Sequence, residues 1–103
     1  MGKHSVTMSD FYCVHCGKAG LPVWRRKGGA RKDGHLKTLF CIFCGKETNH
    51  VECKPNTPYN YEDFKLEFEY GNFTEEGSRI YTLKQLKGLI RDGKLEKQKT
   101  LVD

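Results

Sequence analysis

Apolar residues in the first half of this chain occur in short runs, and these runs predict strands. They comprise Phe11 with Tyr12, then residues 21–26, 35–40 and 47–53. Pro22 stands near the start of the second run, where a missing N–H group is tolerated. Residues 27–34 contain several glycines and an Asp-Gly pair, so they predict a turn-rich loop between two strands.

The second half follows helical spacing. Residues 54–59 contain two prolines and predict a linker. Further on, one apolar stripe begins after the N-cap Thr82 and ends before Gly93, and it consists of Leu83, Leu86, Leu89 and Ile90. This stripe predicts a helix, and residues 94–103 are expected to trail off as a flexible tail, as are residues 1–9 at the other end.

Residues 61–70 fit two patterns. Phe64, Leu66, Phe68 and Tyr70 alternate with charged residues as in a strand, but Phe64 and Phe68 also have the i,i+4 spacing of a helix. Asn60 and Asp63 form a helix cap, and Gly71 provides a stop. The caps favour a helix.

Two copies of the pattern C-x-x-C-G-K stand in the first half. The first cysteine turn covers residues 13–18 and the second covers residues 41–46. Two thiolates at this spacing bind one cation from a single tight turn, so Cys13, Cys16, Cys41 and Cys44 predict a tetrahedral metal site. Zinc is the default metal, and iron in the same all-sulfur geometry is the alternative.

The sequence gives less support to two other uses of these cysteines, as disulfides or as a redox motif. Disulfides require an oxidising compartment, and the N-terminal residues lack the apolar segment of a signal peptide. A thioredoxin-like C-x-x-C expects a βαβ context, which the pattern does not show. With no apolar run of about 18 residues, a membrane span is not expected, and the sequence indicates a cytoplasmic protein.

The order of cysteine turn, strand, long loop, strand, cysteine turn and strand over residues 10–53 resembles the zinc-ribbon family. The resemblance rests on Cys13, Cys16, Cys41 and Cys44. It implies a small antiparallel sheet beside one structural zinc ion. More loosely, the whole chain is similar to small zinc-ribbon proteins of bacteria and their phages. The expected fold is α+β: a zinc ribbon over residues 10–53 and a mostly helical appendage over residues 60–93.

The size of the chain makes a structural metal plausible on physical grounds. The protein has 103 residues, of which 37% are hydrophobic and 30% charged. A segment as short as residues 10–53 buries little apolar surface, and small domains of this kind use a metal in its place. We therefore expect the first half to be unfolded without metal.

Charge is concentrated in one segment. Residues 25–37 contain six basic side chains and one acid, and their excess equals the net charge of +5 of the whole chain. The basic residues are Arg25, Arg26, Lys27, Arg31, Lys32 and Lys37. A glycine-bearing loop with these side chains suits phosphate contacts. Trp24 at its base either stacks on an unpaired base or covers the small core.

The remaining candidates carry little chemistry. His15 is expected to be exposed, since four cysteines already close the metal site, and Cys53 to be a small buried apolar group. His35 and His50 are not expected to act as bases or ligands. No nucleophile–base motif or P-loop is present in the sequence, so no enzymatic activity and no small-molecule substrate are expected.

The sequence predicts a nucleic-acid-binding protein of transcription, translation or replication that partners RNA or DNA, within a large nucleoprotein machine. The alternative is an adaptor that binds RNA polymerase or the ribosome through its second half. Residues 62–76 are acidic and residues 79–99 basic, so these segments either contact a partner or pack on each other.

Overall fold

The computed structural model describes residues 6–21, 23–26, 34–53 and 58–101, and for residues 6, 7 and 23–26 it describes the backbone only. Four strands precede two helices in the chain. They are β1 (Val6–Cys13), β2 (Val23–Arg26), β3 (Leu36–Cys41), β4 (Lys46–Cys53), α1 (Tyr61–Glu69) and α2 (Leu83–Arg91). The predicted α+β class is confirmed.

The strands form one antiparallel sheet in the order β2-β1-β4-β3. β1 serves two partners along its length: residues 6–9 pair with β2, and residues 10–13 pair with β4. The prediction that residues 1–9 form a flexible leader therefore differs from the structure at residues 6–9, which are the first half of β1. Residues 1–5 lie outside the described part of the chain.

The two helices begin at side-chain caps. The Asn60 side chain accepts a hydrogen bond from the Asp63 N–H, and Asp63 accepts one from the Asn60 N–H. Thr82 and Gln85 form the same reciprocal pair at the start of α2. These caps agree with the sequence prediction, which favoured a helix over residues 61–70, and Gly71 and Gly93 follow the helices with positive φ angles.

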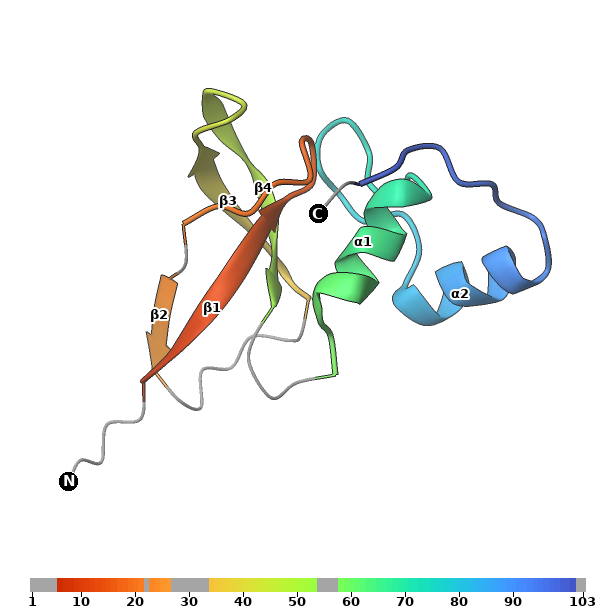
Figure 1. The fold of residues 1–103 in the computed structure, drawn as a ribbon, viewed down its shortest axis with the longest axis horizontal. Helices are drawn as coiled ribbons and strands as arrows, with labels where there is room; N and C mark the ends of the chain where they lie inside the picture. Colours follow the sequence, from red (N-terminus) through yellow and green to blue (C-terminus); the bar gives the residue numbers. More distant parts are fainter. Residues whose placement is uncertain (1–5, 22, 27–33, 54–57, 102–103) are drawn as a thin grey trace.

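One hydrophobic core joins the two halves of the molecule. Phe64 and Phe68 of α1 pack against Val14, Val51 and Cys53 of the sheet side. Figure 1 shows α1 between the sheet and α2. The helical segment that the sequence set apart as an appendage thus shares its core with the strands.

A buried carboxylate fixes the connection between the helices. Glu67 has no exposed surface and accepts hydrogen bonds from Tyr59, Asn72 and Arg79, with Arg79 Nε 2.6 Å from its Oε2. Burial and the neighbouring Glu67 carboxylate raise the pKa of the Tyr59 phenol well above its usual value. Because both carboxylate oxygens of Glu67 accept hydrogen bonds, we interpret this network as a structural element that holds the connection between the helices.

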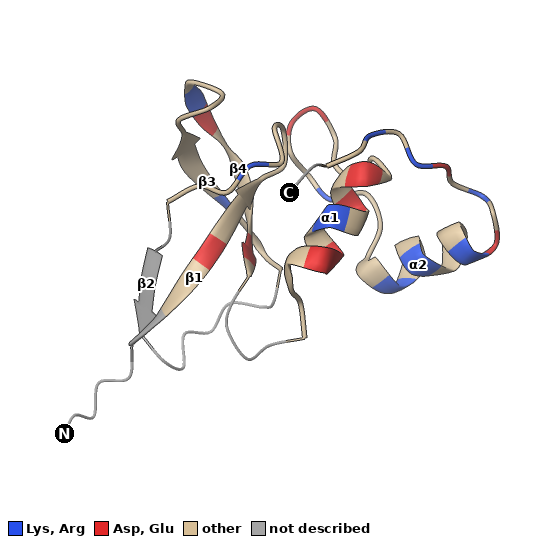
Figure 2. Cartoon of the chain, in the orientation of Figure 1, with Lys and Arg blue, Asp and Glu red and all other residues tan. Residues whose placement is uncertain are grey.

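The acidic and basic segments of the second half also pack together. Lys87 of α2 lies 3.5 Å from Asp63 of α1, and Lys97 lies 3.3 Å from Glu69. Figure 2 shows acidic positions on α1 and basic positions on α2. Intramolecular packing of these segments, one of the two predicted arrangements, is therefore present.

The C-terminal residues return to α1, which the sequence did not predict. The N–H groups of Gln98 and Lys99 donate to the Glu69 carbonyl, and the Leu101 N–H donates to the Glu69 carboxylate at 2.7 Å. Leu101 packs against the core. In the described part of the chain, neither helix is long and apolar enough to span a membrane.

Candidate metal centre

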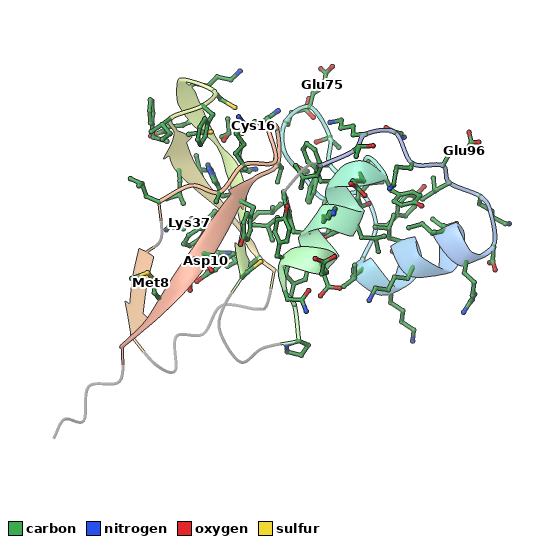
Figure 3. The ribbon with its side chains drawn as sticks, viewed as in Figure 1. Met8, Asp10, Cys16, Lys37, Glu75 and Glu96 are labelled. Carbon is green, nitrogen blue, oxygen red and sulfur yellow. The ribbon has the colours of Figure 1, made fainter. Side chains whose placement is uncertain are left out.

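Strand pairing brings the four cysteines of the two turns together. Cys13 ends β1 and Cys41 ends β3, and both strands flank β4 in the sheet. Cys16 lies in the loop that follows β1, beside the β3–β4 hairpin (Figure 3). The first cysteine turn therefore faces the second across the end of β4, although the turns are distant in sequence.

The two turns have the same local geometry. In each, the glycine N–H donates to the carbonyl of the first cysteine at 2.8 Å: Gly17 to Cys13 and Gly45 to Cys41. Both glycines have φ angles near the left-handed region, at 76° and 73°. A residue with a side chain is strained there, which explains the glycine after each second cysteine.

The sulfur positions fit a tetrahedral ion. Cys13 Sγ lies 3.8 Å from Cys44 Sγ, Cys16 Sγ lies 3.7 Å from Cys41 Sγ, and all four sulfur atoms lie within 4.8 Å of one another. A tetrahedron with zinc–sulfur bonds of about 2.3 Å has edges of about 3.8 Å. These separations exceed the disulfide bond length of about 2.05 Å, and the five cysteines are free.

Hydrogen bonds favour thiolates at the site. The His15 N–H points to Cys13 Sγ and the Cys44 N–H to Cys41 Sγ, both at 3.4 Å, and Thr48 Oγ1 lies 3.0 Å from Cys13 Sγ. Burial alone would raise the pKa of the Cys41 thiol, but the N–H groups of Cys44 and Phe43 lower it to about 7.

The pKa of Cys16 is raised, so this thiol stays protonated at neutral pH unless a cation is bound. Burial, with the neighbouring Cys13 thiol, raises the pKa of Cys16 to about 12. A cluster of four thiolates at this spacing is therefore unfavourable unless a metal ion balances its charge. The residues fit a metal ion with four sulfur ligands and no open coordination position.

The other candidate residues lie as expected or apart from the site. Cys53 is a buried core residue, as predicted, and burial raises its pKa to about 12. His15 is exposed. His35 Nε2 lies 2.8 Å from the buried Glu52, and the buried His50 ring has its Nδ1 3.0 Å from the Thr48 carbonyl oxygen.

The predicted nucleic-acid residues lie mostly outside the described part of the chain, so their arrangement stays a prediction. Lys27, Arg31 and Lys32 lie outside the described residues. The side chains of Trp24, Arg25 and Arg26 also lie outside them, although their backbone forms β2 opposite Met8, Thr7 and Val6. Lys37 is half-buried on β3, opposite His50.

An exposed aromatic surface on the second cysteine turn was missed by the sequence analysis. Phe40, Ile42 and Phe43 are 59%, 62% and 54% exposed. Lys18 of the first turn places its Nζ 4.7 Å from the centre of the Phe43 ring, and Lys46 is exposed in the second turn. The available signal was the pair of apolar residues between Cys41 and Cys44, in a turn too small to bury both.

The fold and the site thus define an α+β protein with a cluster of four cysteines that could hold a metal ion. The chain matches no protein-family model, no curated protein and no solved structure in the comparisons with known proteins. The description of the centre therefore depends on its own geometry.

Proposed function

We propose that this chain is a zinc-ribbon protein that binds nucleic acid and uses one structural zinc ion to hold its binding surface. Four thiolate ligands and sulfur separations close to those of a zinc tetrahedron support zinc as the metal. A site closed by four thiolates leaves no position for substrate or water, which supports a structural role for the ion, and our proposal includes no enzymatic activity. Thiolate ligands suit a reducing compartment such as the cytoplasm.

The observation that carries the nucleic-acid proposal is the exposed surface formed by Lys18, Phe40, Ile42, Phe43 and Lys46, called here the second-turn surface. Exposed aromatic rings stack on unpaired bases, and lysines contact the phosphates between them. Lys18 already lies over the Phe43 ring, so an aromatic face and a positive charge occupy the same place.

The charge of residues 25–37 supports the same proposal. The net charge of this segment is +5, which equals the net charge of the whole chain. If about three to five phosphates are neutralised, the logarithm of the affinity falls with the logarithm of the salt concentration with a slope of about −3 to −4.5. Such a protein would serve transcription, translation or replication, with RNA or DNA as its partner.

Fluorescence anisotropy of the zinc-loaded protein tests the proposal. Fluorescein-labelled single-stranded and duplex RNA and DNA are titrated across a salt series. Phe43→Leu keeps an apolar side chain but removes the ring, and we expect it to weaken single-strand binding about 5- to 150-fold. Tyr81→Leu, which removes an exposed ring beside α2, is the control and should leave the affinity unchanged.

A second variant tests the basic segment. A variant with glutamine in place of Arg25, Arg26, Arg31 and Lys32 should lose nucleic-acid binding while it keeps its zinc ion. Correctly folded, zinc-loaded protein that binds none of the four polymers at low salt would contradict the nucleic-acid proposal and leave the metal centre standing.

A further inference from the structure

The outward face of α2 is an apolar surface that the fold covers only in part. Of its apolar stripe, Leu86 is fully buried, while Leu83, Leu89 and Ile90 are half-buried. α2 lies at one end of the longest axis of the molecule and β2 at the other (Figure 1). The helix is therefore remote from β2, whose backbone includes Arg25 and Arg26.

An open hollow of about 360 Å³ lies along this helix. Its lining residues are Tyr81, Gln85, Gly88, Leu89 and Asp92. Its walls are mostly apolar, and the neighbouring Ile80 is 49% exposed. The hollow has room for a large apolar side chain, and in the described part of the chain no such side chain fills it.

Gly88 forms part of this hollow and has no evident role in the fold. It occupies the interior of α2, and it is not among the glycines with positive φ. A Cβ atom added at this position would meet no atom within 4 Å. Glycine is the weakest helix former after proline, so its presence here is unfavourable for the helix. The absence of a side chain at position 88 keeps the hollow open.

Basic side chains stand on both sides of Gly88. Lys84 precedes it by four residues and Arg91 follows it by three, so both are its neighbours on the helix surface. Both are exposed, and α2 itself contains no acidic residue. Asp92, the acid in the hollow, lies 3.6 Å from Arg91. The charged residues beside the hollow are therefore two bases and one acid, which leaves a net charge of +1.

We propose that the α2 hollow binds an acidic, amphipathic segment of a partner protein. One apolar side chain of that segment enters the hollow over Gly88, and carboxylates beside it face Lys84 and Arg91. Concave apolar walls suit an apolar side chain better than a phosphate backbone, which is why a protein segment is the occupant. This inference does not depend on nucleic-acid binding, because its residues belong neither to the second-turn surface nor to residues 25–37.

The test uses the full zinc-loaded chain and a synthetic peptide. The probe is a labelled amphipathic peptide with leucine and phenylalanine at i, i+3 and i+4 positions and glutamate elsewhere. The control peptide has lysine in place of each glutamate. We expect micromolar binding of the acidic peptide only, with amide chemical-shift changes concentrated in residues 80–92.

Gly88→Ala separates binding from folding. Alanine favours the helix, so the variant should melt about 4–8 °C higher than the natural chain. Its methyl group would occupy the place over position 88 where the apolar side chain enters, so it should weaken peptide binding at least tenfold. A variant that is stabilised and binds the peptide with unchanged affinity would overturn the proposal. Loss of affinity together with a lower melting temperature would also count against it, since a damaged helix would then explain the loss.

Charge variants on α2 and on the second-turn surface identify the occupant. The double variant Lys84→Gln, Arg91→Gln should weaken peptide binding about tenfold and leave nucleic-acid affinity unchanged. The double variant Lys18→Gln, Lys46→Gln should leave peptide binding unchanged. If the α2 pair instead lowers nucleic-acid affinity, the surface belongs to nucleic acid and the proposal is wrong. It is equally wrong if Gly88→Ala abolishes a dimer seen by light scattering, because the hollow then receives a second copy of the chain.

Discussion

The two cysteine turns have nearly the same sequence and share the hydrogen bond from the glycine N–H to the first cysteine carbonyl, but the molecule surrounds them differently. Val14, between the cysteines of the first turn, is 4% exposed and belongs to the core, whereas Ile42 at the matching position of the second turn is 62% exposed. A Cβ added to Gly17 would lie 2.8 Å from Leu101, while one added to Gly45 would meet nothing within 4 Å.

This difference in burial separates two properties of the cysteine turn: how it presents its ligands and how it packs against the rest of the protein. The ligand spacing and the glycine belong to the motif itself and recur in both turns. What covers each turn depends on residues far away in the sequence: Phe68 of α1 and Leu101 lie against Gly17, and no described atom lies within 4 Å of a Cβ at Gly45. The first turn therefore joins the cysteine cluster to the core, and the second leaves Ile42 and Phe43 exposed.

Removing the metal should have the largest effect, because it releases both turns at once. Structural zinc contributes about 10–16 kcal/mol in small fingers, which matches or exceeds the usual stability of a domain. We expect chelation, or Cys13→Ser, to unfold the sheet and α1 together, since Val14 connects the first turn to Phe64 and Phe68. Unfolding is measured as a loss of chemical-shift dispersion in the amide NMR spectrum.

Cys53→Ala is the matched control for that experiment. Cys53 lies in the core and outside the sulfur cluster, so the variant should keep one zinc ion per chain by elemental analysis. A chelated protein that kept its dispersed spectrum would show that apolar packing alone holds the fold, and the structural role of the metal would be refuted.

Alanine at the two glycines tests the comparison directly. At Gly45 the cost is the strain of a positive φ, about 1–2 kcal/mol. At Gly17 the same strain is joined by a clash with Leu101 and Phe68, which adds about 1–3 kcal/mol. Urea unfolding in excess zinc should therefore find Gly17→Ala the less stable variant, and equal losses would mean that the two turns are equally free of neighbours.

The local parts of this structure follow from the sequence, and the long-range parts do not. The cysteine spacing predicted the metal cluster, and the caps Asn60 and Thr82 predicted the helix starts, because each depends on residues a few positions apart. The strand pairing of residues 6–9 was missed, although Val6 and Met8 alternate with Thr7 and Ser9, because four residues near the chain start give a short signal and their partner β2 is separated from them by the first cysteine turn.

Exposure was the other quantity that the sequence could not supply. Phe40 and Leu86 are both large apolar residues at element positions, but Phe40 is 59% exposed and Leu86 is fully buried. Which of them is covered depends on where α1 and the C-terminal residues pack. For the same reason the second-turn surface emerged only from the structure, while sequence patterning directed attention to residues 25–37.

The smallest predicted effect concerns the hydrogen bond that holds the C-terminal residues over the first turn. The Leu101 N–H, and after it Lys97, lower the pKa of the Glu69 carboxyl below its usual value of 4.5. A carboxyl with a lowered pKa in the folded state stabilises the fold above the ordinary pKa, and this contribution is lost as the pH falls through the folded value. Acid should therefore release Leu101 from Gly17.

Glu69→Gln examines the same contact at neutral pH, where protons do not compete with the metal for the cysteines. The amide still accepts a hydrogen bond but lacks the charge, so the loss should be about 1 kcal/mol. We expect hydrogen exchange at the Leu101 amide to quicken about fivefold, with some increase at Gly17. Exchange at Gly45 should not change, because a Cβ at Gly45 would meet no atom within 4 Å, whereas one at Gly17 would meet Leu101. Equal acceleration at Gly17 and Gly45 would mean that the variant loosens the metal centre as a whole, and the contrast between a covered and an open turn would then be lost.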